Sequence, residues 1–127
     1  MKKIIKTSEA PAPIGPYNQA ILAGDTLYVS GQIALDPATG ELLKGSIEEE
    51  TDLVMKNLKA VLDAAGADFS HVVKSSIFVK DMGQFARINA VYGTYFSADT
   101  APARETVEVA NLPKYVNVEI SVIAVLG

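Results

Sequence analysis

The pattern of hydrophobic and polar positions predicts strands and helices in the order β-β-β-α-β-α-β-β. Apolar runs on either side of Gly24-Asp25 are typical of a hairpin. Further strands are expected near 71–80, over 104–110 and over 115–125, where apolar and polar residues alternate. Because strand–helix–strand units cross over with one hand, both helices should cover the same face of one sheet, in a two-layer α+β arrangement.

The two predicted helices have clear starting signals. Ser46 is followed three residues later by Glu49, which predicts a capping box, and Gly66 suits the end of that helix. Its apolar stripe comprises Ile47, Val54, Leu58, Val61, Leu62 and Ala65. Asp81 is the expected cap of the second helix. The second stripe comprises Phe85, Ile88, Tyr92, Tyr95 and Phe96.

The strand after the hairpin contains a glycine in its interior. Alternation divides its residues into two sets, with Leu27, Val29 and Ile33 on one face and Tyr28, Ser30 and Gln32 on the other. A glycine inside a strand lowers its stability, so Gly31 indicates a β-bulge or the close approach of another group.

Three strands are expected to share a polar face. In the last strand the apolar positions would lie under the helices and the polar positions on the opposite side. The predicted polar face comprises Tyr28, Ser30, Gln32, Arg104, Thr106, Glu108, Asn117, Glu119 and Ser121. This set is rich in hydroxyl and amide groups and contains no lysine, unlike a freely solvated face. We therefore expect another copy of the chain to cover it and to form a pocket at the subunit boundary.

Arg104 and Glu119 provide the candidate chemistry of this face. A guanidinium can hold a carboxylate ligand through two parallel hydrogen bonds. A glutamate can act as a general base or orient a water molecule. The alternative is a structural ion pair between Arg104 and Glu119, and the pattern alone favours neither interpretation.

Composition narrows the class of protein. A length of 127 residues predicts one domain, residues 1–127. The absence of cysteine excludes a disulfide framework and a thiolate metal site, and the single histidine, His71, excludes a histidine-rich one. A net charge of −4 argues against a general nucleic-acid binder. No signal-peptide pattern or apolar run of membrane length is present, so we expect a soluble cytoplasmic protein.

Several motifs occur in order from one end of the chain to the other. They are I-G-P-Y-N-Q-A at 14–20, V-S-G-Q-I at 29–33, D-P-x-T-G-E at 36–41, and P-A-R-x-x-V-x-V-A-x-L-P-K at 102–114 followed by V-E-I. Together they resemble the reactive intermediate deaminase family, RidA, formerly YjgF. The resemblance implies a chorismate-mutase-like α+β fold with about six strands. It also implies a homotrimer whose sheets form a central barrel, with active sites between subunits.

The resemblance further implies an activity and its residues. The family hydrolyses reactive 2-imino and enamine acids, such as 2-iminopropanoate and 2-iminobutanoate, to 2-oxo acids and ammonia, without a metal or an organic cofactor. Arg104 matches the arginine that grips the substrate carboxylate, and Glu119 the glutamate that positions the attacking water. The matched substrate-binding positions are Tyr17, Ser30, Gly31 and Asn89.

The chain departs from the family pattern at a few positions. Thr106 stands where many members carry cysteine, and the family contacts ligand there largely through the backbone, so activity is expected to survive. Asn111 and Tyr115 also differ from the commoner residues.

Two other functions remain open at this point. One is a non-catalytic module that binds or senses a small carboxylate, although the presence of both Arg104 and Glu119 favours catalysis. The other is an endoribonuclease or translation inhibitor. The acidic balance of the chain and its single histidine weigh against that function.

Overall fold

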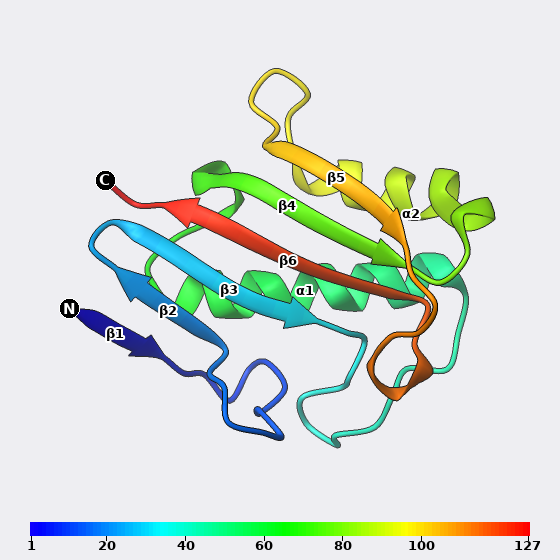
Figure 1. Ribbon diagram of the computed structural model, residues 1–127, viewed down its shortest axis with the longest axis horizontal. Coiled ribbons are helices and arrows are strands. Elements are labelled where there is room, and N and C mark those ends of the chain that lie inside the picture. The colour runs from blue at the N-terminus through cyan, green and yellow to red at the C-terminus, as the bar shows by residue number, and fades with distance from the viewer.

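The computed structural model describes residues 1–127 as a six-stranded sheet with two helices packed on one of its faces (Figure 1). The strands are β1 (Lys2–Ile5), β2 (Ala20–Ala23), β3 (Thr26–Gln32), β4 (Val72–Val79), β5 (Ala103–Glu108) and β6 (Val118–Val125). Across the sheet they run in the order β1-β2-β3-β6-β4-β5. Only β4 and β5 are parallel. The predicted order of elements and the two-layer α+β arrangement are confirmed.

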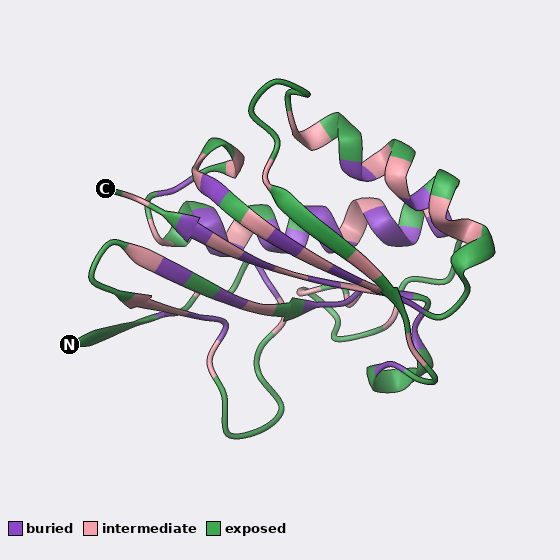
Figure 2. Cartoon of the chain, turned by 45° about the horizontal axis from the view of Figure 1, so that its top comes forward, coloured by how far each residue is buried: buried purple, intermediate pink, exposed green.

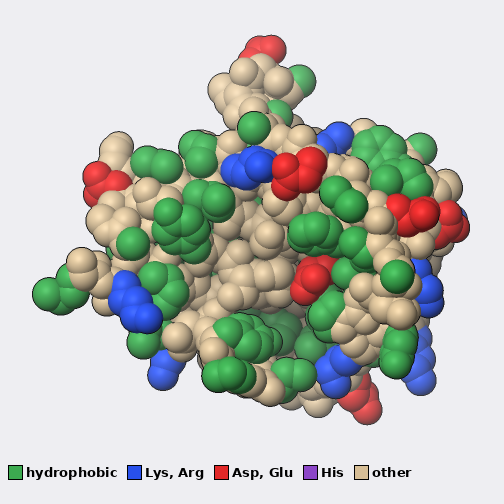
Figure 3. Space-filling model, in the orientation of Figure 1, with side chains coloured by type: hydrophobic (Ala, Val, Ile, Leu, Met, Phe, Trp, Pro, Cys, Tyr) green, Lys and Arg blue, Asp and Glu red, His purple; other side chains and the backbone are tan.

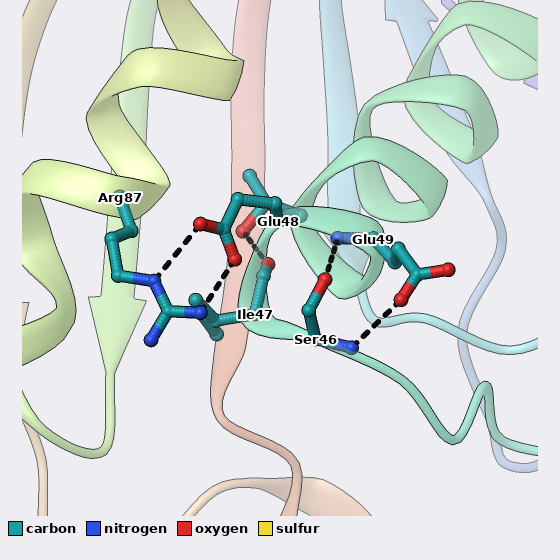
Figure 4. Close-up of polar contacts among 6 residues, drawn as sticks. Ser46, Ile47, Glu48, Glu49 and Arg87 are labelled. Atoms are coloured by element: carbon teal, nitrogen blue, oxygen red, sulfur yellow. Dashed lines mark hydrogen bonds and ion pairs between the residues drawn. The ribbon is translucent and has the colours of Figure 1, made fainter.

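Helix α1 (Ile47–Ala64) begins and ends where its sequence signals predict. The Ser46 hydroxyl accepts a hydrogen bond from the Glu49 amide at 3.1 Å, and the Glu49 carboxylate accepts one from the Ser46 amide at 2.9 Å (Figure 4). After the helix, Gly66 adopts a φ of +75°, which glycine tolerates without a steric penalty. The predicted capping box is therefore confirmed.

Helix α2 (Phe85–Tyr92) is shorter than the periodicity predicts, because single 3₁₀ turns precede and follow it. Asp81 caps the first of these turns by accepting a hydrogen bond from the Gly83 amide. The Arg87 guanidinium binds the Glu48 carboxylate of α1 through two hydrogen bonds of 2.9 and 2.7 Å (Figure 4). This exposed ion pair joins the two helices near the start of α1.

The core lies between the helices and the sheet (Figure 2). Strand residues that point toward the helices are fully or almost fully buried, among them Leu27, Ile77, Val118 and Ile120. The other surface of the sheet, which we call the outer face, has no helix on it and is viewed directly in Figure 3. Neither helix combines the length and the apolarity needed to cross a membrane.

The outer face is more apolar than the sequence predicts. The register places several exposed apolar side chains on it, namely Ile4, Tyr28, Val107 and Val125. The register also places a lysine on this face: Lys74, which pairs with Ile123 and forms an ion pair of 2.9 Å with Glu105. An uncovered sheet face of this kind is typical of a contact surface rather than of a freely solvated one.

Candidate functional site

Glu119 of β6 lies on the outer face and contributes to a pocket of about 90 Å³. The walls of this pocket come from the N-terminal loop, the end of β3 and the loop before β6, and they include Ile14, Tyr17, Gly31, Ile33 and Lys114. The space is large enough for several water molecules or a small organic acid. Two predicted substrate-binding residues, Tyr17 and Gly31, thus lie beside Glu119.

The Glu119 carboxylate is half-buried, and burial raises its pKa above that of an exposed glutamate. No hydrogen bond or positive charge offsets this cost of desolvation. A carboxylate whose pKa is raised is a stronger base, and it is better suited to take a proton from water.

Gly31 is the reason why Glu119 can occupy this position. A β-carbon at residue 31 would lie 2.7 Å from Oε2 of Glu119 and 2.8 Å from its Cδ, which is closer than real contacts allow. The pairing of β3 with β6 is also interrupted between Val29 and Gln32. Both predictions from this glycine, a bulge and a close approach, are confirmed.

The bulge also changes the direction of the residues that follow it. Gln32 pairs with Ile120, whose side chain points toward the helices, and Gln32 is almost completely buried. The prediction that Gln32 lies on the same face as Tyr28 is therefore wrong. Alternation continues only while a strand is regular, and the extra residue of a bulge shifts its phase.

Replacing Gly31 with alanine is expected to displace the Glu119 carboxylate with little loss of stability. The added methyl group must displace the end of the Glu119 side chain, which is flexible, so the cost to folding is small. Any reaction that uses this carboxylate should slow at least tenfold, because moving a reacting group by about 1 Å can lower a rate by as much as about 100-fold. The melting temperature should stay near that of the wild type, and an unchanged rate in such a reaction would contradict this role of Gly31.

Ser30 supports the pocket rather than facing into it. Its hydroxyl donates to the Asn18 carbonyl at 2.6 Å, and its amide donates to the Gln19 carbonyl at 2.9 Å. The buried Gln19 side chain in turn binds the backbone of the N-terminal loop at Thr7, Ala10 and Pro11. These bonds position the segment that carries Tyr17. This role of Gln19 could not be predicted from the sequence pattern, although the residue lies within the I-G-P-Y-N-Q-A motif.

Arg104 of β5 lies in a second pocket, next to α2. Its Nη1 donates a hydrogen bond of 2.6 Å to Oδ1 of Asn89, and its guanidinium carbon lies 5.1 Å from the ring centre of Tyr92 and 5.5 Å from that of Phe85. Contacts of this kind hold the guanidinium in one place. The side chain is exposed and has no carboxylate partner. It can therefore accept an anionic ligand.

Arg104 and Glu119 lie on opposite faces of the sheet. Arg104 pairs with Ser75, a buried residue on the helix side, whereas Glu119 pairs with Phe78 on the outer face. The prediction that the two charged residues share a face is wrong, and it is wrong in the same way for Thr106 and Glu108. Alternation shows which residues of one strand point the same way. Only the register between strands shows which face of the sheet that is.

One chain therefore cannot bring both groups to a small substrate. β5 lies two strands from β6, and Arg104 is three residues away from Val107, the β5 residue level with Glu119. Standard strand spacings put their Cα atoms about 14 Å apart, with side chains pointing in opposite directions. This geometry also rules out the alternative of an ion pair between Arg104 and Glu119 within the chain. We call the surroundings of Glu119 and of Arg104 the two half-sites.

Thr106 belongs to neither pocket wall. Its hydroxyl is buried and makes no hydrogen bond. His71, the single histidine, lies in the 3₁₀ turn before β4 and accepts a hydrogen bond from the Asp68 amide. Neither of these side chains takes part in the two half-sites.

Known proteins match this chain over almost its whole length. Residues 7–126 match a family model described as endoribonuclease L-PSP. A RutC family protein of Synechocystis is 55% identical, over 98% of this chain and 96% of the relative. The 2-iminobutanoate/2-iminopropanoate deaminase of Mus musculus is 46% identical, over 100% of this chain and 93% of the relative.

Solved structures show the same fold. A Yersinia pestis protein of the conserved Rid family has a TM-score of 0.95 and 46% identity, over 98% of this chain and 99% of that one. Escherichia coli TdcF with bound serine has a TM-score of 0.92 and 41% identity, over 98% of this chain and 99% of that one.

Proposed function

Since the chain belongs to the YjgF/RidA family, we propose that it hydrolyses reactive 2-imino acids and their enamine tautomers to 2-oxo acids and ammonia. The observation that carries this proposal is the contrast between the two half-sites. One presents an arginine without a carboxylate partner, and the other presents a carboxylate with a raised pKa. The first suits the substrate's carboxylate, and the second suits the activation of water.

The proposed reaction uses only groups of the protein and one water molecule. The Arg104 guanidinium binds the substrate carboxylate and fixes the neighbouring imine carbon. Glu119 accepts a proton from water as the water oxygen forms a bond to that carbon, and the electrons of the C=N double bond move to nitrogen. The protonated Glu119 returns this proton to the carbinolamine nitrogen, which then leaves as ammonia. The C–O bond becomes the carbonyl of the 2-oxo acid as the departing ammonia takes up the hydroxyl proton to form ammonium, and Glu119 is ionised again. A protonated imine is already electrophilic, so modest activation of water is sufficient.

We propose that the complete site forms between two copies of the chain, with Arg104 from one and Glu119 from the next. The positions of the half-sites on opposite faces support this arrangement, since a short substrate cannot span them within one chain. The exposed apolar side chains of the outer face supply a surface for such a contact. A closed ring of three chains, with the sheets turned inward, is the assembly that we propose.

The direct test uses an imine generated in the assay. An amino-acid oxidase converts 2-aminobutanoate to 2-iminobutanoate, and the protein is added while the formation of 2-oxobutanoate is followed. We expect the wild-type protein to accelerate hydrolysis above the spontaneous rate. If the folded protein gives no acceleration with imines of several sizes, the proposed activity is wrong.

A mixing experiment tests the division of the site between chains. We expect Arg104→Ala and Glu119→Gln proteins to be inactive alone. After they are unfolded and refolded together in equal amounts, one interface in four combines an intact Arg104 with an intact Glu119 in a ring assembled at random. Activity should therefore return to about a quarter of the wild-type value. If each site lies within one chain, mixing restores nothing.

The binding of a small carboxylate without turnover is the second candidate function. It is favoured by the solved structure of TdcF, which contains bound serine. Calorimetric titration with serine and with 2-oxobutanoate separates the two functions. Tight binding by a protein that does not accelerate imine hydrolysis would favour the binding module.

A further inference from the structure

Glu50, in the first turn of α1, is a buried carboxylate that the proposed reaction does not use. It accepts three hydrogen bonds from the start of β6: from the Asn117 amide and side-chain Nδ2, both at 2.8 Å, and from the Val118 amide at 3.3 Å. No lysine or arginine lies within ion-pair distance of it. A buried charge is costly unless fixed donors surround it, so this carboxylate and these amides constrain one another.

The segment that Glu50 holds leads directly to Glu119. The preceding loop turns through two left-handed residues, Lys114 and Tyr115, and is not part of the sheet. The Asn117 carbonyl also accepts a hydrogen bond from the Lys80 amide at 3.0 Å. Residue 117 is therefore clamped between α1 and the end of β4, immediately before β6 begins.

The position of Glu119 depends on the backbone at the start of β6. Its carboxylate makes no hydrogen bond, so that backbone and the close approach to Gly31 determine where it lies. On the β3 side, the ladder is interrupted next to it by the bulge at Gly31. The regular pairs with β4 and the bonds from Glu50 are the constraints that remain.

We infer that Glu50 is a positioning residue for Glu119, aligning the proposed base with the substrate by fixing the first residues of β6. This inference rests on the proposed function. Glu50 does not touch the pocket and takes no part in proton transfer. Its effect should therefore appear in kcat, with little change in KM.

The test compares three variants in the imine assay. Glu50→Ala leaves the Asn117 and Val118 amides without an acceptor, and we expect kcat to fall at least tenfold while KM stays within about threefold. Glu50→Gln keeps one oxygen for these amides and should restore kcat to within about threefold of wild type. Glu48→Ala removes the same charge from the same turn and is the matched control, with kcat close to wild type. Wild-type kcat in folded Glu50→Ala, or equal loss in Glu50→Gln, would overturn the inference.

Two further measurements keep the test decisive. If Glu50→Ala does not fold, Asn117→Ala replaces it, because Asn117 is exposed and its change removes only one of the three hydrogen bonds. We expect a severalfold loss of kcat there, and wild-type kcat would count against the inference. Hydrogen exchange at the Asn117 and Val118 amides should be faster in Glu50→Ala than in wild type, and this readout does not depend on activity. Failure of the wild type to hydrolyse imines would instead refute the proposed function.

Discussion

Arg104→Ala is expected to lower kcat/KM for 2-iminobutanoate by about 10²- to 10³-fold, which corresponds to about 3–4 kcal/mol of transition-state stabilisation. The guanidinium is held by Asn89 and lies against the rings of Tyr92 and Phe85, so its orientation is fixed before a ligand binds. Alanine removes both the positive charge and the two parallel hydrogen bonds that the guanidinium can donate to the substrate carboxylate. The measurement is steady-state imine hydrolysis by purified protein.

Two control variants test the reason for this loss. Arg104→Lys keeps the charge but not the planar fork, so it should recover only part of the activity. Arg87→Ala removes an arginine from α2 whose partner is Glu48, and it should leave turnover almost unchanged. Size-exclusion chromatography must show the same oligomer for each protein. If Arg104→Ala dissociates the oligomer, its loss of activity would point to a structural role instead.

Glu119→Gln is expected to lower kcat by about 10²- to 10⁴-fold, the usual contribution of a general base. Glutamine has almost the same shape but cannot accept the proton of the attacking water. In the wild type, the base must be ionised, so activity should rise with pH through the pKa of Glu119. Because burial raises that pKa, the midpoint of this rise should lie above 4.5, the ordinary value for a glutamate. A midpoint at or below 4.5 would contradict the assignment.

The same substitution should make the protein more stable at neutral pH. The pKa of Glu119 is raised by folding, so its protonated form favours the folded state at low pH. This stability is lost as the pH rises from the unfolded value through the folded one. Glutamine cannot ionise, so Glu119→Gln should gain on wild type in urea unfolding at pH 7 and match it near pH 4, at equal protein concentration. Lower stability than wild type at pH 7 would contradict the desolvation of Glu119.

Local signals in the sequence predict local structure well here. The capping box depends on Ser46 and Glu49, three positions apart, and the end of the same helix depends on Gly66 just beyond it. Such features are determined by short-range sterics and hydrogen bonds, which a sequence pattern records directly. The order of the elements follows from the same patterns.

The face on which Arg104 lies could not be predicted by alternation. β5 is an edge strand, and apolar residues occur on its outer side, where Val107 is exposed. Polar residues on its other side contact α2 and the 3₁₀ turn before it: Arg104 binds Asn89 of α2, and Glu108 accepts a hydrogen bond from the Met82 amide of that turn. The usual rule that apolar residues point toward the helices fails for this strand, because α2 presents polar groups to it. Only the parallel register with β4 reveals this.

The contacts of Glu50 could not be predicted from the sequence for a related reason. In the sequence it is one of three consecutive glutamates at the start of a helix, where acidic residues favour the helix dipole. Its partners are 67 and 68 residues away along the chain. Contacts over such distances leave no periodic trace in a single sequence.

The separation of the half-sites has a consequence for how activity would arise in the cell. If each site needs two chains, a newly folded chain is inert, and turnover begins only after the chains associate. The specific activity would then fall on dilution, with a lag after rapid dilution from a concentrated stock that reflects the rate of dissociation. The cellular concentration of the chain would then determine what fraction of it is active.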